Sequence, residues 1–177
     1  SGVSEEEQIN HSRPLEGMRV IDLTDHRGDV GPWMLGELGA DVIKVEPPGG
    51  CSTRALNPIR KDDISDLRSL HFSSYSSNKR SIVLDLEDPG ERATFLKLVE
   101  SADFLYESGL PTPLSQMGID RNELRAINEE MVHVVVTPFG IDGPRSGDPH
   151  SELSIASLGG SPNLQGTPDR PPVKASI

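Results

Sequence analysis

The most constraining feature of this sequence is a repeated alternation of short Val/Ile/Leu-rich runs with helix-like segments. The first two runs are residues 18–24 (MRVIDLT) and 41–46 (DVIKVE), and the apolar, Gly-spaced segment 33–40 lies between them. Two strands joined by one short helix are expected to be parallel, with a right-handed crossover. Runs without clean polar alternation are typical of a parallel sheet that is covered on both faces.

The same alternation continues to residue 137, and a loop, a short helical stretch and a Pro-rich tail follow it. Asp88 and Pro89 have the residue types of a helix N-cap and first turn, and the apolar stripe behind them predicts a buried face. Residues 51–68 show no clear period and indicate an exposed excursion. Further strands are predicted at 81–86, 102–106 and 131–137, and further helices at 89–101, 121–128 and 151–158. The pattern predicts an α/β fold with an open, mainly parallel, Rossmann-like sheet, whose bare edge would need further chain or another chain to cover it.

Charge and cysteine content narrow the classes of partner. The formal net charge of −11 over 177 residues argues against nucleic acid or a membrane surface as a partner, so an anionic ligand must meet a local basic group. Cys51 is the only cysteine, which excludes an intramolecular disulfide and favours a reduced, cytoplasmic setting. Residues 1–12 are polar and are interpreted as a tag remnant or flexible N-terminus, leaving residues 13–177 as the folded part.

Several common sites are disfavoured by the motifs. Loop 26–32 is not a GxGxxG fingerprint, and its acidic residues would oppose a pyrophosphate, so NAD binding is disfavoured. The five histidines show no metal-ligand spacing, and His133 is expected to be a hydrogen-bonded structural imidazole. The contiguous residues 150–152 (HSE) are not expected to form a hydrolase triad, and Cys51 is expected to be a solvent-exposed bystander rather than a nucleophile.

Ligands of open parallel sheets gather at the carboxyl ends of the strands. The loops expected there are 25–32, 47–58, 107–113 and 138–152. The most local basic feature is Asn78-Lys79-Arg80, just before the predicted strand 81–86. Two interpretations of it stay open, a solvated strand entrance and a phosphate clamp.

Longer motifs resemble the family III (CaiB/BaiF-type) CoA-transferases, which include formyl-CoA transferase, from Pro14 to Gly166. The matching motifs include PLEGMRVIDLT (14–24), LGADVIKVEPPGG (38–50), SNKRSIVLDLEDPGER (77–92), SADFLYES (101–108) and FGIDGP (139–144). The resemblance implies the incomplete N-terminal part of a Rossmann-like large domain that later chain completes. It also implies two subunits interlocked like chain links.

The activity implied by the resemblance is transfer of CoA between an acyl-CoA and a carboxylic acid. In such enzymes an aspartate carboxylate attacks the thioester, giving a mixed anhydride and then an enzyme–CoA thioester. The aligned position here is Glu152, in ELSIASLGG (152–160). Glutamate adds one methylene, and a displacement of about 1 Å can cost about 10²-fold in rate. Glu152 therefore has two open interpretations, a nucleophile and an acid that stabilises a helix N-terminus.

The same resemblance assigns contacts to CoA, and the spacing of the histidines predicts no metal site. The predicted CoA-binding residues are His26, Arg54, Lys79, Arg80, Ser108, Gly109, Gln116 and Met117. Two loops depart from the family pattern. The loop after the first strand is two residues longer than the usual T-Q-V-x-A-G-P, and residues 107–112 (ESGLPT) replace the usual E-N-F-x-P-G.

The predicted partners are an acyl-CoA and a carboxylic acid, with a homodimer or a remaining lobe completing the protein. One alternative is a non-catalytic lobe that binds acyl-CoA or a partner chain within a larger, two-copy CoA-transferase. Another is a racemase-like acyl-CoA enzyme with a proton-transfer pair, for which the sequence offers no convincing His/Asp pair at matched positions.

Overall fold

The computed structural model of the chain describes residues 13–61, 65, 67–165 and 169–170. The described residues form two compact units, one that ends at Val136 and one that begins at Thr137. The expected tag remnant at residues 1–12 lies outside the described residues.

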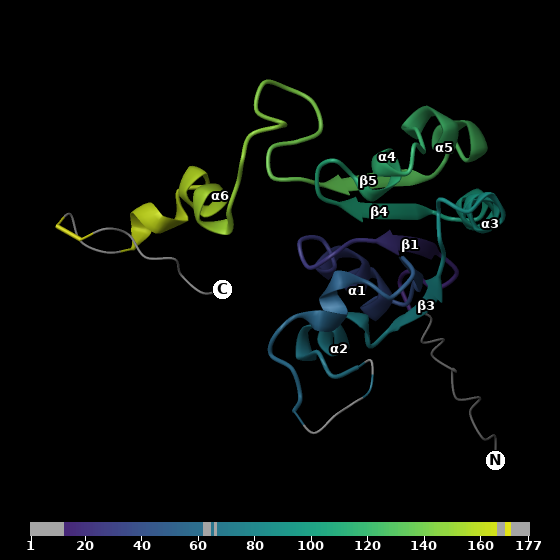
Figure 1. Cartoon of the computed structure of the whole chain (residues 1–177), viewed down its shortest axis with the longest axis horizontal. Helices are drawn as coiled ribbons and strands as arrows, with labels where there is room; N and C mark the ends of the chain where they lie inside the picture. The colour runs from purple at the N-terminus through teal and green to yellow at the C-terminus, as the bar shows by residue number, and fades with distance from the viewer. Residues whose placement is uncertain (1–12, 62–64, 66, 166–168, 171–177) are drawn as a thin grey trace, which may run out of the picture. The chain divides into compact units, whose positions relative to one another are not determined.

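The first unit is built on a five-stranded parallel sheet in the order β3-β2-β1-β4-β5 (Figure 1). The strands are β1 (Arg19–Leu23), β2 (Asp41–Glu46), β3 (Lys79–Val83), β4 (Phe104–Ser108) and β5 (Val132–Val136). Strand β1 is central, and all four neighbouring pairs are parallel. The predicted α/β class and the open, parallel, Rossmann-like sheet are confirmed.

Helices cover both faces of this sheet (Figure 1). One face carries α1 (Val30–Glu37), the 3₁₀ turn η1 (Ser52–Ala55) and α2 (Leu70–Ser76), and the other carries α3 (Pro89–Glu100), α4 (Pro113–Gln116) and α5 (Arg121–Ile127). Asp88 caps α3 by accepting hydrogen bonds from the backbone N–H groups of Gly90 and Glu91, as its position before Pro89 predicts.

The two faces of the sheet differ in chemistry. The main apolar core lies under α3, α4 and α5, where Ile21 and Leu105 of the sheet meet Phe95 of α3. On the opposite face the strands begin apolar, at Val20 and Val42, and then carry buried charged side chains toward their carboxyl ends. Because side chains alternate along a strand, each strand supplies both layers.

The structure corrects several element boundaries. Helix α2 was not predicted, because its sequence LHFSSYS has no apolar stripe and buries only Phe72. Strand β3 begins at Lys79 instead of residue 81, and β4 begins at Phe104 instead of residue 102. The segment 107–113, expected as loop, leads into the short helix α4.

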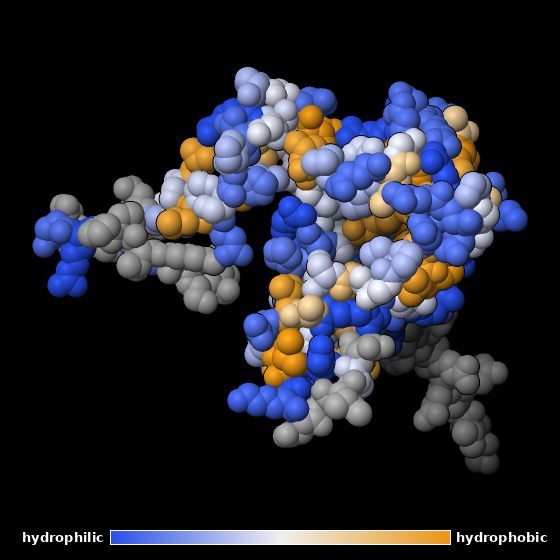
Figure 2. All heavy atoms as spheres, in the orientation of Figure 1, coloured by the Kyte–Doolittle hydropathy of each residue, from blue (hydrophilic) through white to orange (hydrophobic). Residues whose placement is uncertain are grey.

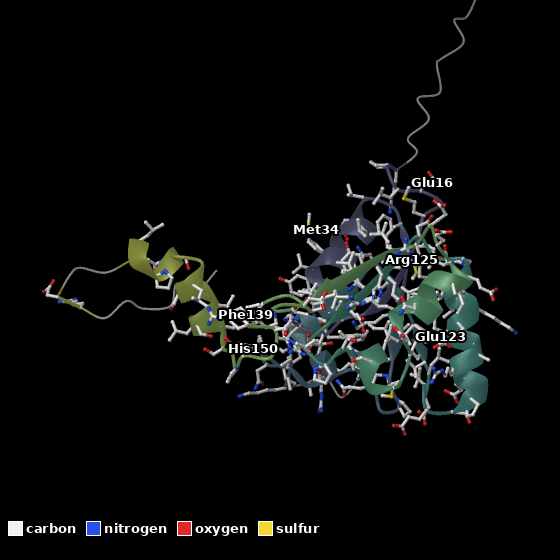
Figure 3. All side chains as sticks on the ribbon, turned by 90° about the horizontal axis from the view of Figure 1, so that it is seen from above. Glu16, Met34, Glu123, Arg125, Phe139 and His150 are labelled. Carbon is white, nitrogen blue, oxygen red and sulfur yellow. The ribbon has the colours of Figure 1, made fainter. Side chains whose placement is uncertain are left out.

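The second unit contains α6 (Glu152–Leu158) and the 3₁₀ turn η2 (Ser161–Leu164). Ser151 caps α6 in a reciprocal capping box with Ser154, and the helix ends at Gly159, in agreement with the predicted helix. Earlier in this unit Phe139 and His150 lie edge to face, with ring centroids 6.4 Å apart (Figure 3).

Large apolar side chains remain exposed along α1. Val30, Met34 and Leu38 follow one another at intervals of four residues, and all three are exposed.

On the face shown in Figure 2, hydrophobic and hydrophilic residues are interspersed. Within the residues that the structure describes, no helix is long and apolar enough to cross a membrane.

Candidate functional site

A pocket of about 330 Å³ lies at the carboxyl ends of strands β1 to β4, where ligands of open parallel sheets bind. Three of the four loops expected there contribute to its wall; the fourth, 138–152, belongs to the second unit. The lining residues from the three loops are Asp25, Arg27, Pro47, Pro48, Cys51, Ser52, Ser108, Pro111 and Pro113.

One wall of the pocket joins the loop after β1 to the end of β4. Ser108 Oγ accepts a hydrogen bond from the backbone N–H of Asp25 (2.9 Å) and donates one to Asp25 Oδ1 (2.8 Å). Arg27 donates hydrogen bonds to the same carboxylate from Nε (2.9 Å to Oδ2) and Nη2 (2.5 Å to Oδ2). Burial alone would raise the pKa of Asp25, but the hydrogen bonds from Arg27 and Ser108 outweigh it and lower the pKa to about 2.

The opposite wall is organised by Glu46, the last residue of β2. Arg54 of η1 donates to both of its carboxylate oxygens, at 2.6 and 2.7 Å, while Arg54 also lies 4.0 Å above the ring of Phe72. Ser81 and the backbone N–H of Cys51 donate to the same carboxylate. Burial alone would raise the pKa of Glu46, but the hydrogen bonds from Arg54 and Ser81 have the larger effect and lower the pKa to about 2. The carboxylate is therefore ionised and neutralised by Arg54.

Cys51 lines the pocket but is not set up as a nucleophile. Its Sγ lies 2.8 Å from Thr53 Oγ1, and burial raises the pKa of the thiol. The thiolate is the reactive form, so a raised pKa works against reactivity at neutral pH. The expectation that Cys51 is solvent-exposed is wrong, because the residue is half-buried.

A buried charge cluster lies beneath this region of the sheet. Asp22 Oδ2 accepts hydrogen bonds from Lys79 Nζ (2.8 Å) and Lys44 Nζ (3.3 Å), and each of the three side chains is at most 2% exposed. Burial would raise the pKa of Asp22, but the two ammonium groups lower it. Burial lowers the pKa of Lys79, against the opposing effect of Asp22.

The structure separates the predicted basic pair Lys79 and Arg80. Lys79 is buried against Asp22, whereas Arg80 is exposed and pairs with Asp41, the first residue of β2, at the amino end of the sheet. Neither residue lines the pocket, and the described residues do not bring them together as a joint phosphate clamp.

The other predicted CoA-binding residues divide into two groups. Ser108, Gln116 and Met117 line the pocket. Gly109 follows Ser108 directly, with a positive φ of 98°. His26 is exposed on the turn before α1, and Arg54 stands behind Glu46; neither is among the lining residues.

Glu152 is the first residue of α6, in the second unit, where Ser151 and Ser154 fix the first helical turn. Ser151 Oγ accepts a hydrogen bond from the Ser154 N–H, so it serves as a cap. His150 contacts Phe139 edge to face. His150 and Ser151 thus have separate structural partners, Phe139 and Ser154.

Two imidazole–carboxylate pairs were missed by sequence reasoning. His71 Nε2 lies 2.7 Å from Asp29 Oδ2, and His133 Nε2 lies 2.9 Å from Glu107 Oε1. Asp29 and Glu107 are buried, and none of the four residues lines the pocket. The second pair gives His133 the hydrogen bond expected of a structural imidazole. In the described part of the chain, no group of three or more His, Cys, Asp or Glu side chains is placed to hold a metal ion.

Comparison with known proteins places the chain in a family. The sequence model of CoA-transferase family III matches residues 15–177. The chain is 38% identical over 163 residues to the acetyl-CoA:oxalate CoA-transferase of Acetobacter aceti, covering 91% of this chain and 41% of that protein. It is 38% identical over 160 residues to a subunit of the succinyl-CoA:(R)-benzylsuccinate CoA-transferase of Thauera aromatica, covering 89% and 38%.

Solved structures agree with the sequence comparison. A CaiB/BaiF family protein from Brucella suis superposes with a TM-score of 0.78 at 34% identity, covering 94% of this chain and 44% of that one. The chain thus spans about two fifths of the length of the relatives it matches. With the family's motifs in order along a matching parallel sheet, the chain belongs to CoA-transferase family III, a family of enzymes.

Proposed function

We propose that the full-length protein transfers coenzyme A between an acyl-CoA and a carboxylic acid, and that the pocket at the carboxyl ends of β1 to β4 holds the acyl-CoA. The observation that carries this proposal is the position of the pocket in a chain whose family relatives include CoA-transferases for oxalate and glutarate.

The lining of the pocket supports a ligand with an apolar and an anionic part. Leu23, Val45, Leu84, Leu86 and Met117 offer aliphatic surface, and polar groups gather at Asp25, Arg27 and Ser108. A volume of about 330 Å³ lies at the lower end of the range of about 300–1,000 Å³ that is common for ligand sites. A molecule as large as CoA would therefore extend beyond this pocket.

We further propose Glu152 as the carboxylate nucleophile, on the basis of its alignment with the family aspartate. The carboxylate oxygen would attack the thioester carbonyl, so that a C–O bond forms, the C–S bond breaks and CoA leaves as the thiolate. The thiolate would then attack the enzyme's own carbonyl carbon in the mixed anhydride, releasing the first acid and leaving an enzyme–CoA thioester. The acceptor carboxylate repeats these two steps in reverse.

The first experiment incubates the full-length protein with acetyl-CoA and a set of mono- and dicarboxylic acids. Mass spectrometry of the products should reveal a new acyl-CoA for at least one acid. If no acid yields a new acyl-CoA under any of these conditions, the proposal of CoA transfer is wrong.

The second experiment tests Glu152 separately, by trapping the enzyme–CoA thioester with borohydride or hydroxylamine and mapping the modified peptide. Glu152→Gln should abolish both turnover and the adduct, because an amide is a far weaker nucleophile than a carboxylate. Glu152→Asp restores the residue type of the family pattern and should keep the adduct. An adduct that maps to another carboxylate, with full activity in Glu152→Gln, assigns the nucleophile elsewhere and leaves CoA transfer intact.

A second candidate function is a non-catalytic lobe that binds acyl-CoA or a partner chain, with chemistry on another copy. The relative from Thauera aromatica is named as a subunit, which favours association with a further chain. We propose a homodimer or such a complex, located in the cytoplasm. Light scattering of the purified protein measures the assembly, and this candidate predicts CoA binding with activity that Glu152→Gln leaves unchanged.

A further inference from the structure

The pocket contains few positive charges for a site that would bind an anionic molecule. Among the described residues that line it, Arg27 is the only cation, while Asp25, Glu46 and Asp85 are acids. The chain as a whole carries a net charge of −11. An anion that enters the pocket is therefore attracted chiefly by the N–H groups of Arg27 that do not bind Asp25.

Asp25 engages one edge of the Arg27 guanidinium. Its carboxylate accepts from Nε and Nη2, and in the described part of the chain Nη1 has no hydrogen-bond partner. A guanidinium carries five N–H donors in a planar fork, so one edge can bind Asp25 while the other binds a second anion. The side chain is 40% exposed, which leaves that second edge accessible.

The guanidinium is held by Asp25 and lies close to Gly109. Ser108 anchors the Asp25 carboxylate, and Gly109 lies so close to Arg27 that a Cβ at Gly109 would come within 2.6 Å of Nη2. A fixed donor loses less conformational entropy when a ligand binds than a mobile surface arginine does. Because residue 109 is a glycine, the Arg27 guanidinium has room beside it, next to the pocket.

We propose that Arg27 binds an anionic group of the substrate through the guanidinium edge that Asp25 does not use. The inference rests on the proposed CoA-binding pocket. A phosphate of CoA and the carboxylate of the acid substrate share this chemistry, since both accept paired N–H donors. Arg27 lies in the loop between β1 and α1, at the carboxyl end of the central strand.

The test uses the full-length protein and isothermal titration calorimetry with CoA, dephospho-CoA and pantetheine. A charge-assisted hydrogen bond contributes enough that Arg27→Gln should weaken CoA binding about 10- to 100-fold. Pantetheine carries no phosphate, and its affinity should stay within about twofold. Arg125→Gln is the matched control, because it removes an exposed arginine on α5 outside the pocket (Figure 3).

The two sources of the anion are separated by adding a kinetic measurement. A loss of CoA affinity in Arg27→Gln identifies a phosphate of CoA as the group that Arg27 binds. If the variant also binds CoA and dephospho-CoA with equal affinity, while the wild type prefers CoA, that group is the 3′-phosphate. Unchanged CoA affinity with an acid KM raised about tenfold or more identifies the substrate carboxylate. Unchanged CoA affinity and unchanged KM overturn the inference.

Asp25→Asn distinguishes a ligand contact from a structural role. If Arg27 only anchors the loop through Asp25, Asp25→Asn and Arg27→Gln should weaken binding equally, and that result overturns the inference. If Arg27 contacts the ligand, Asp25→Asn leaves the guanidinium in place for the ligand and removes a competing negative charge, so it should weaken binding much less than Arg27→Gln does. A wild-type protein that turns over acyl-CoA but shows no effect of Arg27→Gln refutes the inference alone, whereas a wild type that binds neither CoA nor pantetheine also refutes the proposed function.

Discussion

Asp22 is the only carboxylate in contact with the two buried ammonium groups of Lys44 and Lys79 among the described residues, and its replacement by Asn should be severely destabilising. All three side chains are at most 2% exposed, so water cannot replace the lost charge. Removing one partner of a buried ion pair typically costs about 3–5 kcal/mol. The alternative for the protein is to deprotonate one lysine, which at pH 7 costs about 4.6 kcal/mol from an ordinary pKa near 10.4.

Both routes give a loss of about 3–5 kcal/mol in the free energy of unfolding for Asp22→Asn. Urea titration measures it, with the fluorescence of Trp33, the only tryptophan, as the signal. Deprotonation becomes cheaper by about 1.4 kcal/mol per pH unit, so the loss should shrink between pH 7 and pH 9. Lys79→Met should cost less than Asp22→Asn, because it leaves the pair of Asp22 with Lys44 intact.

A matched control exists on the same sheet. Asp41 also lies between two cations, Arg19 and Arg80, but its side chain is 37% exposed and that of Arg80 is 65% exposed. Exposed pairs contribute about 0–1 kcal/mol, so Asp41→Asn should cost no more than about 1 kcal/mol. Equal losses in the two variants, both below about 1 kcal/mol, would refute the reasoning from burial.

Three further predictions concern acid stability, the Gly109 turn and the cap of α3. The folded-state pKa values of Glu46 and Asp25 are about 2, below ordinary values of 4.5 and 3.8, so their contribution is present above pH 4.5 and is lost as the pH falls toward 2. For Glu46 the loss is about 3 kcal/mol, and Glu46→Gln should flatten this dependence in urea titrations at successive pH values. Gly109→Ala should cost about 1–2 kcal/mol in thermal unfolding, because φ is 98°. Asp88→Ala should cost about 1 kcal/mol by the same measurement, since it removes two hydrogen bonds to the helix N-terminus; a loss below about 0.3 kcal/mol would contradict the capping role.

The sheet and most helices were predictable because their signals are local. Asp88 and Pro89 define the start of α3, and the Val/Ile-rich runs define β1 and β2 nearly to the residue. Helix α2 lacks such a signal. It is stabilised by the Ser69 cap and by Phe72 packing under Arg54, and the second of these contacts depends on the tertiary fold. Sequence periodicity cannot reveal a helix whose support comes from a distant side chain.

The candidate site was less predictable, and the basic pair shows why. The predicted strand began at residue 81, which left Lys79 and Arg80 together in a loop. In the structure β3 begins at Lys79, so these neighbours project to opposite faces of the sheet, one toward Asp22 and the other toward Asp41. An error of two residues in the predicted start of the strand therefore made a phosphate clamp conceivable, whereas the structure contains two separate ion pairs.

Arg27 and Lys79 also show why the partner of a cation decides its role. Both pair with a carboxylate. The Lys79 side chain is 1% exposed, and its ammonium donates hydrogen bonds to Asp22 and to the carbonyl of Asp29. Arg27 has a second guanidinium edge and 40% exposure, so it can hold Asp25 and still meet a ligand. In the proposed anion contact, Lys79 thus stabilises the scaffold, whereas Arg27, in the loop between β1 and α1, meets the ligand. Substitution of Arg27 should then change ligand affinity while leaving the sheet unaltered, whereas substitution of Lys79 should destabilise the sheet.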